Sequence, residues 1–140
     1  VYAGWAPSQA FYRERVYLSM GFSSLEDYLI TAWEGRYLQQ DANDILAMVY
    51  TWQKGDISDN PLYEGDFAKA LGSIKAKALI MPSRTDQYFP PEDNEIEVGH
   101  MPNASLSIIP SIWGHLAGGP GRNPEDTHFI DKMLKELFAI

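Results

Sequence analysis

The sequence contains no cysteine among its 140 residues, which excludes a disulfide framework, a thiolate nucleophile and a zinc–thiolate site. Basic residues are also few, with 11 Lys and Arg against 19 Asp and Glu and a formal net charge of -8. This balance argues against a sequence-independent nucleic-acid binder, which needs clustered cations to meet phosphates. Long apolar runs are missing as well, since a stretch such as 78–81 is far too short to span a membrane. We therefore expect no association with nucleic acid or membrane.

The start of the chain lacks the basic stretch and apolar core of a signal peptide, so we expect a cytoplasmic location. Its first residue is Val1 rather than Met, which suggests a processed chain or a part of a longer one. Hydrophobic residues make up 45% and charged residues 21%, as in ordinary globular proteins. The length suits one domain or part of a larger one.

Helical patterns fill the first sixty residues. Ser23 and Glu26 have the spacing of a capping box, and an apolar stripe at helical spacing follows them. Asp41 is predicted to cap a second helix, which Gly55 is placed to stop. Residues 9–18 also predict a helix. The first sixty residues are therefore expected to be mainly helical, with a loop from residue 55 to residue 65.

The pattern changes in the second part of the chain. Two short apolar runs, 76–81 and 105–109, read as buried strands. Pro91 opens a predicted helix between them, and Asn123 is predicted to cap a last helix with Pro124 in its first position. This order predicts parallel strands joined by a right-handed crossover. Because parallel sheets need further strands to be stable, we expect neighbours that this chain does not supply.

Two polar residues follow the predicted strands directly. Asp86 lies just past the end of the first strand and His115 just past the end of the second. The carboxyl ends of parallel strands are where ligands bind, and adjacent strands lie about 5 Å apart. The two side chains are thus able to hydrogen-bond, and such an Asp fixes the tautomer of the imidazole and stabilises the imidazolium. On position alone, the alternative that Asp86 is a turn residue and His115 a loop residue stays open.

Several stretches of sequence together resemble one known family. They are VYAGWAPSQAFYRE, SSLEDYLITAWEG, DANDILAMVYTWQKGDIS, SRTDQYFPPED and WGH. In this order they resemble the C-terminal half of the homoserine O-acetyltransferase-like branch of the α/β-hydrolases, whose triad runs Ser, Asp, His. The resemblance implies that Asp86 is the catalytic acid and His115 the catalytic base. It also implies that residues 1–60 form a helical lid and residues 61–140 the C-terminal part of the hydrolase core.

The sequence departs from the family pattern at two points. It contains no G-x-S-x-G nucleophile elbow, so the resemblance implies that the serine lies upstream, on an N-terminal half. Family members that acetylate homoserine usually carry an Asp directly after the catalytic His, but here Leu116 stands there. A leucine cannot pair with an ammonium group, which disfavours homoserine as the substrate. Trp113 and Leu116 are the predicted substrate-binding residues.

These features predict a serine-dependent enzyme that hydrolyses a small-molecule ester or transfers its acyl group. No metal or other cofactor is implied, and an acyl-CoA thioester would be a substrate if the enzyme is a transferase. We expect this chain alone to be inactive. The competing hypothesis is a non-catalytic fragment or subunit that folds against a partner chain, and a homodimer also stays open. His100 and His128 are expected to lie outside the site.

Overall fold

The computed structural model describes residues 1–139, which divide into two compact units. One unit combines Val1–Glu14 with the chain from Leu71 onward, and the other is Arg15–Ala70. The sequence places a boundary near residue 60 and assigns all of the first part to a lid. The structure instead groups the N-terminal segment with the unit that carries Asp86 and His115. The assignment of a lid and a core stays a prediction.

A two-stranded parallel sheet forms the centre of the first unit. Strand β1 (Ala78–Ile80) pairs with β2 (Ala104–Leu106), so that Leu79 lies opposite Ser105, and a bridge between Ser83 and Ile109 extends the pairing. The predicted parallel arrangement is confirmed. The prediction of buried strands is wrong for both strands, because each has only one neighbour among the described residues. The three residues of β1 are half-buried, and β2 has an exposed residue, Ser105, at its centre.

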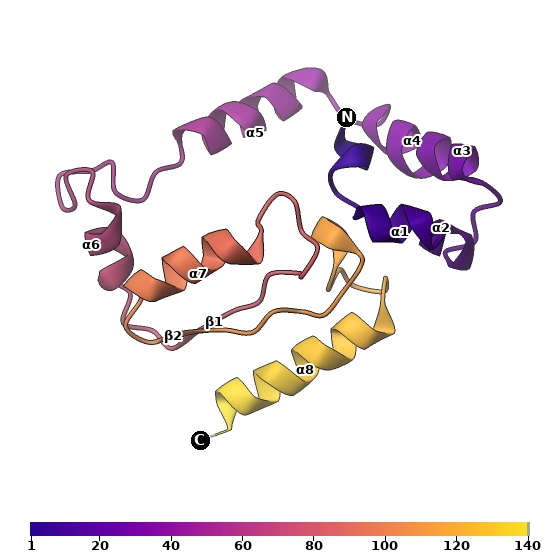
Figure 1. Ribbon diagram of the computed structural model, residues 1–140. Coiled ribbons are helices and arrows are strands. Elements are labelled where there is room, and N and C mark those ends of the chain that lie inside the picture. Colours follow the sequence, from indigo (N-terminus) through magenta and orange to yellow (C-terminus); the bar gives the residue numbers. More distant parts are fainter. Residues whose placement is uncertain (140) are drawn as a thin grey trace. The chain divides into compact units, whose positions relative to one another are not determined.

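Two helices accompany this sheet, one on each of its faces (Figure 1). Helix α7 (Pro91–His100) connects the strands and begins with Pro91 in its first turn, as predicted. Helix α8 (Pro124–Phe138) follows β2, and the Asn123 side chain caps it by accepting a hydrogen bond from the Glu125 N–H. The strand–helix–strand–helix order predicted from the sequence is therefore confirmed.

The N-terminal segment also packs within the first unit. It contains the 3₁₀ turn η1 (Tyr2–Gly4) and helix α1 (Gln9–Arg13). The Ser8 hydroxyl caps α1 by accepting from the Phe11 N–H, and it donates to the carbonyl oxygen of Ile112. The buried ring of Phe11 contacts the Trp113 ring edge-on at 5.3 Å between centroids. These contacts attach the start of the chain to the loop that carries His115.

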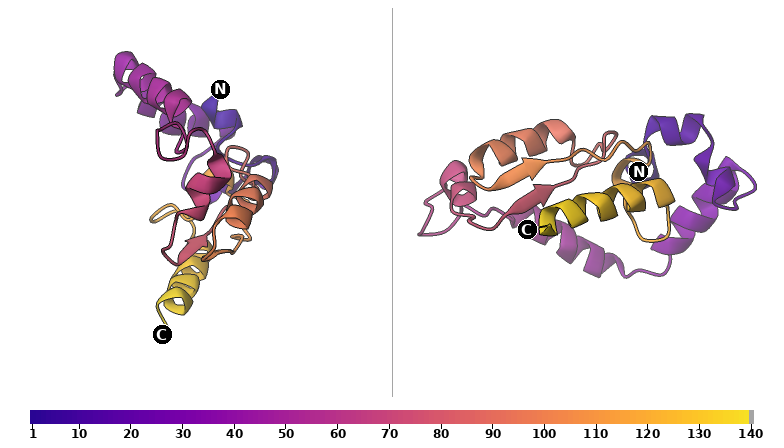
Figure 2. Two further views of the ribbon diagram at one scale, coloured as in Figure 1. Left: turned by 90° about the vertical axis from the view of Figure 1, so that its left-hand side faces the viewer. Right: turned by 90° about the horizontal axis from the view of Figure 1, so that it is seen from below.

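The second unit consists of helices joined by loops, coloured from indigo to magenta in Figure 2, and it has an aromatic core. Tyr17, Tyr28 and Trp33 are its buried aromatic residues, and the Tyr28 ring contacts both of the others. Its helical elements in chain order are α2 (Val16–Ser19), α3 (Leu25–Tyr28), the π-helical segment η2 (Leu29–Glu34), α4 (Gly35–Tyr37) and α5 (Ala42–Lys54). Helix α6 (Phe67–Gly72) contains the second boundary between the units, which falls between Ala70 and Leu71.

Of the two helix caps predicted for this region, one is confirmed and the other lies one residue away. Asp41 caps α5 and Gly55 follows its last residue, as predicted. The predicted capping box is displaced by one residue, because Ser24 rather than Ser23 accepts the hydrogen bond from the N–H of Asp27. The Asp27 carboxylate in turn accepts from the N–H and the hydroxyl of Ser23.

The predicted helix over 9–18 is interrupted. Arg15, with a φ of 54°, separates α1 from α2, and the boundary between the units falls there. Over residues 1–139, no helix is both long and apolar enough to cross a membrane.

Candidate active site

The loop after β1 holds the Asp86 carboxylate in place through its own backbone. Oδ1 of Asp86 accepts hydrogen bonds from the N–H groups of Tyr88, at 2.8 Å, and Phe89, at 3.2 Å. This is an Asx turn, in which an aspartate side chain caps the residues that follow it. The side chain is only 8% exposed. One carboxylate oxygen is thus occupied by the loop, and Oδ2 is directed elsewhere.

His115 lies in the 3₁₀ turn η3 (Gly114–Leu116) and meets that second oxygen. Its Nδ1 lies 3.0 Å from Oδ2 of Asp86, and its side chain is 29% exposed. An ionised carboxylate can only accept, so this contact places the proton on Nδ1 and leaves the lone pair of the neutral ring on Nε2. The structure therefore brings together the two residues that the sequence singles out, in the geometry of a general base and its orienting acid.

The backbone of the His115 turn is fixed by the N-terminal segment. The N–H of His115 donates to the carbonyl oxygen of Ala6 at 2.7 Å. Gly114 has a φ of +63°, and a Cβ atom there would lie 2.4 Å from the same oxygen and 2.8 Å from the nitrogen of Ser8. Only glycine fits such a close approach. The position of the imidazole thus depends on packing between the two ends of the first unit.

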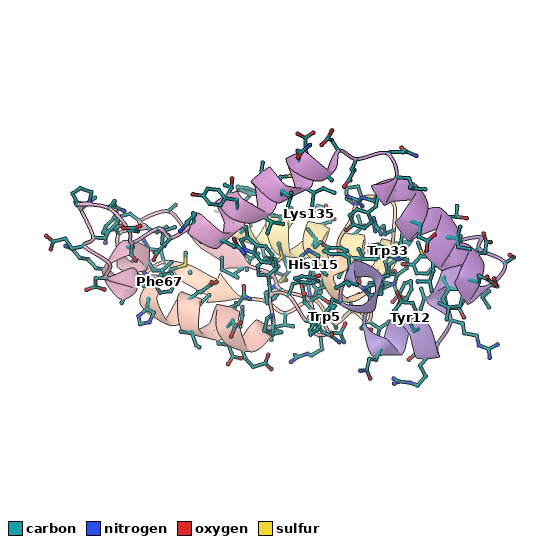
Figure 3. All side chains as sticks on the ribbon, turned by 90° about the horizontal axis from the view of Figure 1, so that it is seen from above. Trp5, Tyr12, Trp33, Phe67, His115 and Lys135 are labelled. Carbon is teal, nitrogen blue, oxygen red and sulfur yellow. The ribbon has the colours of Figure 1, made fainter. Side chains whose placement is uncertain are left out.

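Three aromatic rings lie close to the imidazole of His115, which is labelled in Figure 3. The ring centroids of Tyr88 and Phe89 lie 5.1 and 5.4 Å from that of His115, and Tyr2 meets it edge-on at 6.4 Å. Sequence reasoning missed all three. The position of Tyr88 and Phe89 directly after Asp86 is the signal that points to them, whereas nothing local marks Tyr2. Three aromatic rings therefore lie close to the imidazole.

A cavity of about 370 Å³ opens beside the pair at the carboxyl end of the strands. Asp86, Phe89 and His115 line it together with Asn94 of α7 and the end of β1. Ser83 also lines it, and its buried hydroxyl has no hydrogen-bond partner among the described residues. The cavity therefore combines apolar walls with a few converging polar groups, as small-molecule sites do.

The other residues named from the sequence lie in different environments. Trp113 is buried against Phe11. Leu116 is half-buried at the end of η3. His100 and His128 are exposed on α7 and α8. The substrate-binding roles of Trp113 and Leu116 stay predictions.

The chain is similar to known esterases. It is 35% identical over 136 residues to an ethyl acetate hydrolase from Pseudomonas veronii, a match that covers 97% of this chain and 38% of that protein. A crystal structure of an acetylester hydrolase from Corynebacterium glutamicum superposes with a TM-score of 0.90 at 34% identity, covering 98% of this chain and 38% of that one. The acetyl esterase MekB superposes with a TM-score of 0.85 at 35% identity over 94% of this chain and 37% of that one.

A weaker similarity connects the chain to a homoserine O-acetyltransferase from Chloroherpeton thalassium, which is 33% identical over 92 residues, or 66% of this chain and 24% of that protein. No family model matches the sequence. The chain spans about 38% of the length of the ethyl acetate hydrolase it matches. The homologues are esterases of the α/β-hydrolase fold, and this chain has the fold of the C-terminal portion of those enzymes.

Proposed function

We propose that this chain is the part of a serine-dependent carboxylic-ester hydrolase that supplies the general base, His115, and the carboxylate that orients it, Asp86. The observation that carries the proposal is the 3.0 Å contact between Nδ1 of His115 and Oδ2 of Asp86 beside a cavity. The nucleophilic serine and the oxyanion hole belong to an upstream segment. The complete enzyme is the protein in which this sequence follows that segment.

The reaction follows from the assigned tautomer. Nε2 of His115 takes the proton of the serine hydroxyl while the serine oxygen bonds to the ester carbonyl carbon. Asp86 stabilises the imidazolium that forms. The imidazolium then returns its proton to the departing alcohol as the ester C–O bond breaks, which leaves an acyl-enzyme. Water repeats the sequence with His115 as base, and the carboxylic acid and the free serine are released.

The substrate class that we propose is a small ester, and an acetate ester in particular. The support is the similarity to an ethyl acetate hydrolase and an acetylester hydrolase. Acyl transfer is the second candidate, favoured by the weaker similarity to homoserine O-acetyltransferases. Leu116 opposes homoserine as acceptor, because its apolar side chain offers no partner for an ammonium group.

The test compares the complete enzyme with its His115→Ala variant on p-nitrophenyl acetate. Loss of the general base should lower kcat by about 10⁴-fold or more, as in other triads. The matched control is His128→Ala, which removes an exposed imidazole from α8 and should leave turnover unchanged. Full activity of His115→Ala would reject the proposal. A second arm with acetyl-CoA and homoserine separates the candidates, since transfer faster than hydrolysis would favour the transferase.

A further inference from the structure

The loops that carry Asp86 and His115 are joined by a side chain that belongs to neither residue. Thr85 directly precedes Asp86 and is half-buried. Its hydroxyl donates a hydrogen bond to the carbonyl oxygen of Ser111 at 3.0 Å. The hydroxyl oxygen of Thr85 also accepts a hydrogen bond from the N–H of Gly114 at 3.1 Å. One hydroxyl therefore binds both sides of the turn that leads into His115.

The chemistry of a hydroxyl explains why both contacts depend on this one group. A threonine hydroxyl has a single hydrogen to donate and lone pairs to accept with. The Ser111 carbonyl takes the hydrogen, and the Gly114 N–H takes a lone pair. An apolar side chain of the same shape would leave a donor and an acceptor unpaired in a partly buried site, which is costly. The contacts are thus specific to the hydroxyl and not to the volume of the side chain.

The carbonyl that Thr85 holds belongs to a residue that is itself anchored. The Ser111 hydroxyl donates to the buried carboxylate of Asp126 at 2.9 Å and accepts from the N–H of Trp113. Asp126 also accepts from the N–H of Gly118 at 3.1 Å. The loop from 111 to 118 is therefore fastened at both ends to the first turn of α8. Thr85 connects the Asp86 loop to a fixed structure rather than to a mobile one.

We propose that Thr85 is a positioning residue, which sets the separation of Asp86 and His115 by joining their two loops. This inference rests on the proposed function. Thr85 reaches the reaction only through His115, because its hydroxyl is committed to the backbone on both sides. Its loss should let the loops move relative to one another by fractions of an ångström. Small misplacements of reacting groups lower the rate strongly, by about 10²-fold for a shift of 1 Å.

The first experiment replaces Thr85 in the complete enzyme with valine, which keeps the shape and removes the hydroxyl. We expect Thr85→Val to lower kcat for p-nitrophenyl acetate by about 10- to 100-fold, with KM changed far less. The matched control is Thr85→Ser, which keeps the hydroxyl and should restore kcat to near the wild-type value. Equal activity of Thr85→Val and the wild type would overturn the inference. Thr85→Ala, compared with Thr85→Ser, gives the same answer if the valine variant does not fold.

The second experiment repeats the substitution in the Asp86→Asn background. A residue that acts through the Asp86–His115 contact should have little further effect once that contact is impaired. Thr85→Val should therefore change kcat less than about 3-fold there. An equal loss in both backgrounds would reject a positioning role. The proposed function is tested independently of Thr85, because full activity of the His115→Ala variant would reject it whatever the result for the Thr85 variants.

Discussion

At the scale of single residues, the two carboxylate oxygens of Asp86 bind different partners. Oδ1 binds the backbone of the following residues, and Oδ2 binds the imidazole of His115. An asparagine at this position can keep the first role, because its side-chain oxygen still accepts from the N–H groups. It cannot keep the second, because its NH₂ group cannot accept a hydrogen bond from the Nδ1–H group of His115. The substitution therefore separates the structural contribution of Asp86 from its proposed catalytic one.

We predict that Asp86→Asn lowers kcat of the complete enzyme by about 10⁴-fold, since the wrong imidazole tautomer is then favoured. The unfolding midpoint in urea should change little, because the Oδ1 contacts survive. Steady-state kinetics and equilibrium unfolding measure the two effects. The double variant with His115→Ala should be little worse than His115→Ala alone, because residues of one catalytic unit are not additive. Multiplied losses in the double variant would contradict this account.

Gly114 offers a second test at this scale. A methyl group there would meet Ala6 and Ser8 backbone atoms at 2.4 and 2.8 Å, while φ is already +63°. The matched control is Gly121, whose φ is +71° but which has open space where a Cβ would stand. Gly121→Ala should cost about 1–2 kcal/mol from backbone strain alone. Gly114→Ala should cost clearly more in urea unfolding and should also lower kcat. Equal costs would mean that the contact with Ala6 is not important.

The sequence predicts the Asp86–His115 pair but not its surroundings. Each residue follows its own parallel strand, and the strand ends of a parallel sheet converge, so the meeting can be predicted from order alone. Tyr2 comes from a segment more than eighty residues away, and its approach to His115 depends on how the N-terminal segment packs. Sequence periodicity contains no information on such long-range contacts.

At the scale of elements, the start of α3 carries a pH-dependent contact. The pKa of Asp27 is lowered below its ordinary value of 3.8 by hydrogen bonds from the Ser23 N–H, then the Ser23 hydroxyl, then Thr31. Because the folded pKa lies below the unfolded one, the contact stabilises the fold above the unfolded pKa. Its contribution is lost as the pH falls through the folded pKa.

We predict that Ser23→Ala raises the pKa of Asp27, though not fully to 3.8, because the backbone N–H of residue 23 still donates. Thr31→Ala is the matched comparison and should raise it less, since Thr31 contributes less to the shift. Carboxyl ¹³C titration by NMR measures both. A larger rise in Thr31→Ala than in Ser23→Ala would contradict the order of these contacts.

The elements that the sequence misplaces fail for a common reason. The residues from 9 to 18 form one apolar pattern, but Phe11 is buried in the first unit and Tyr17 in the second. The backbone changes direction at Arg15, so that the residues before it pack in one unit and the residues after it in the other. A periodic pattern shows which residues are apolar and not which core each one faces. The caps of α5 and α8 are predicted correctly because capping is a local interaction between neighbouring residues.

At the scale of the whole molecule, many apolar side chains among residues 1–139 are exposed. None of the α5 residues is buried, and Met48 and Trp52 are 69% and 62% exposed. The sheet has two strands, whereas stable parallel sheets are covered on both faces and have more strands. Such surfaces and strand edges promote association with other chains. The chain spans 38% of the length of its ethyl acetate hydrolase relative, which is consistent with cover supplied from elsewhere.

We therefore predict that the 140-residue chain, expressed alone, is partly molten or aggregated and has no esterase activity. Each strand has only one neighbour among the described residues, and the exposed apolar surface of α5 should bind a dye such as ANS. Size-exclusion chromatography and near-UV circular dichroism measure association and tertiary packing, with the complete enzyme as the control. The complete enzyme should give a sharp elution peak, a strong near-UV signal and little dye binding. A monodisperse isolated chain with an equally strong near-UV signal would mean that these two units are stable without an upstream segment.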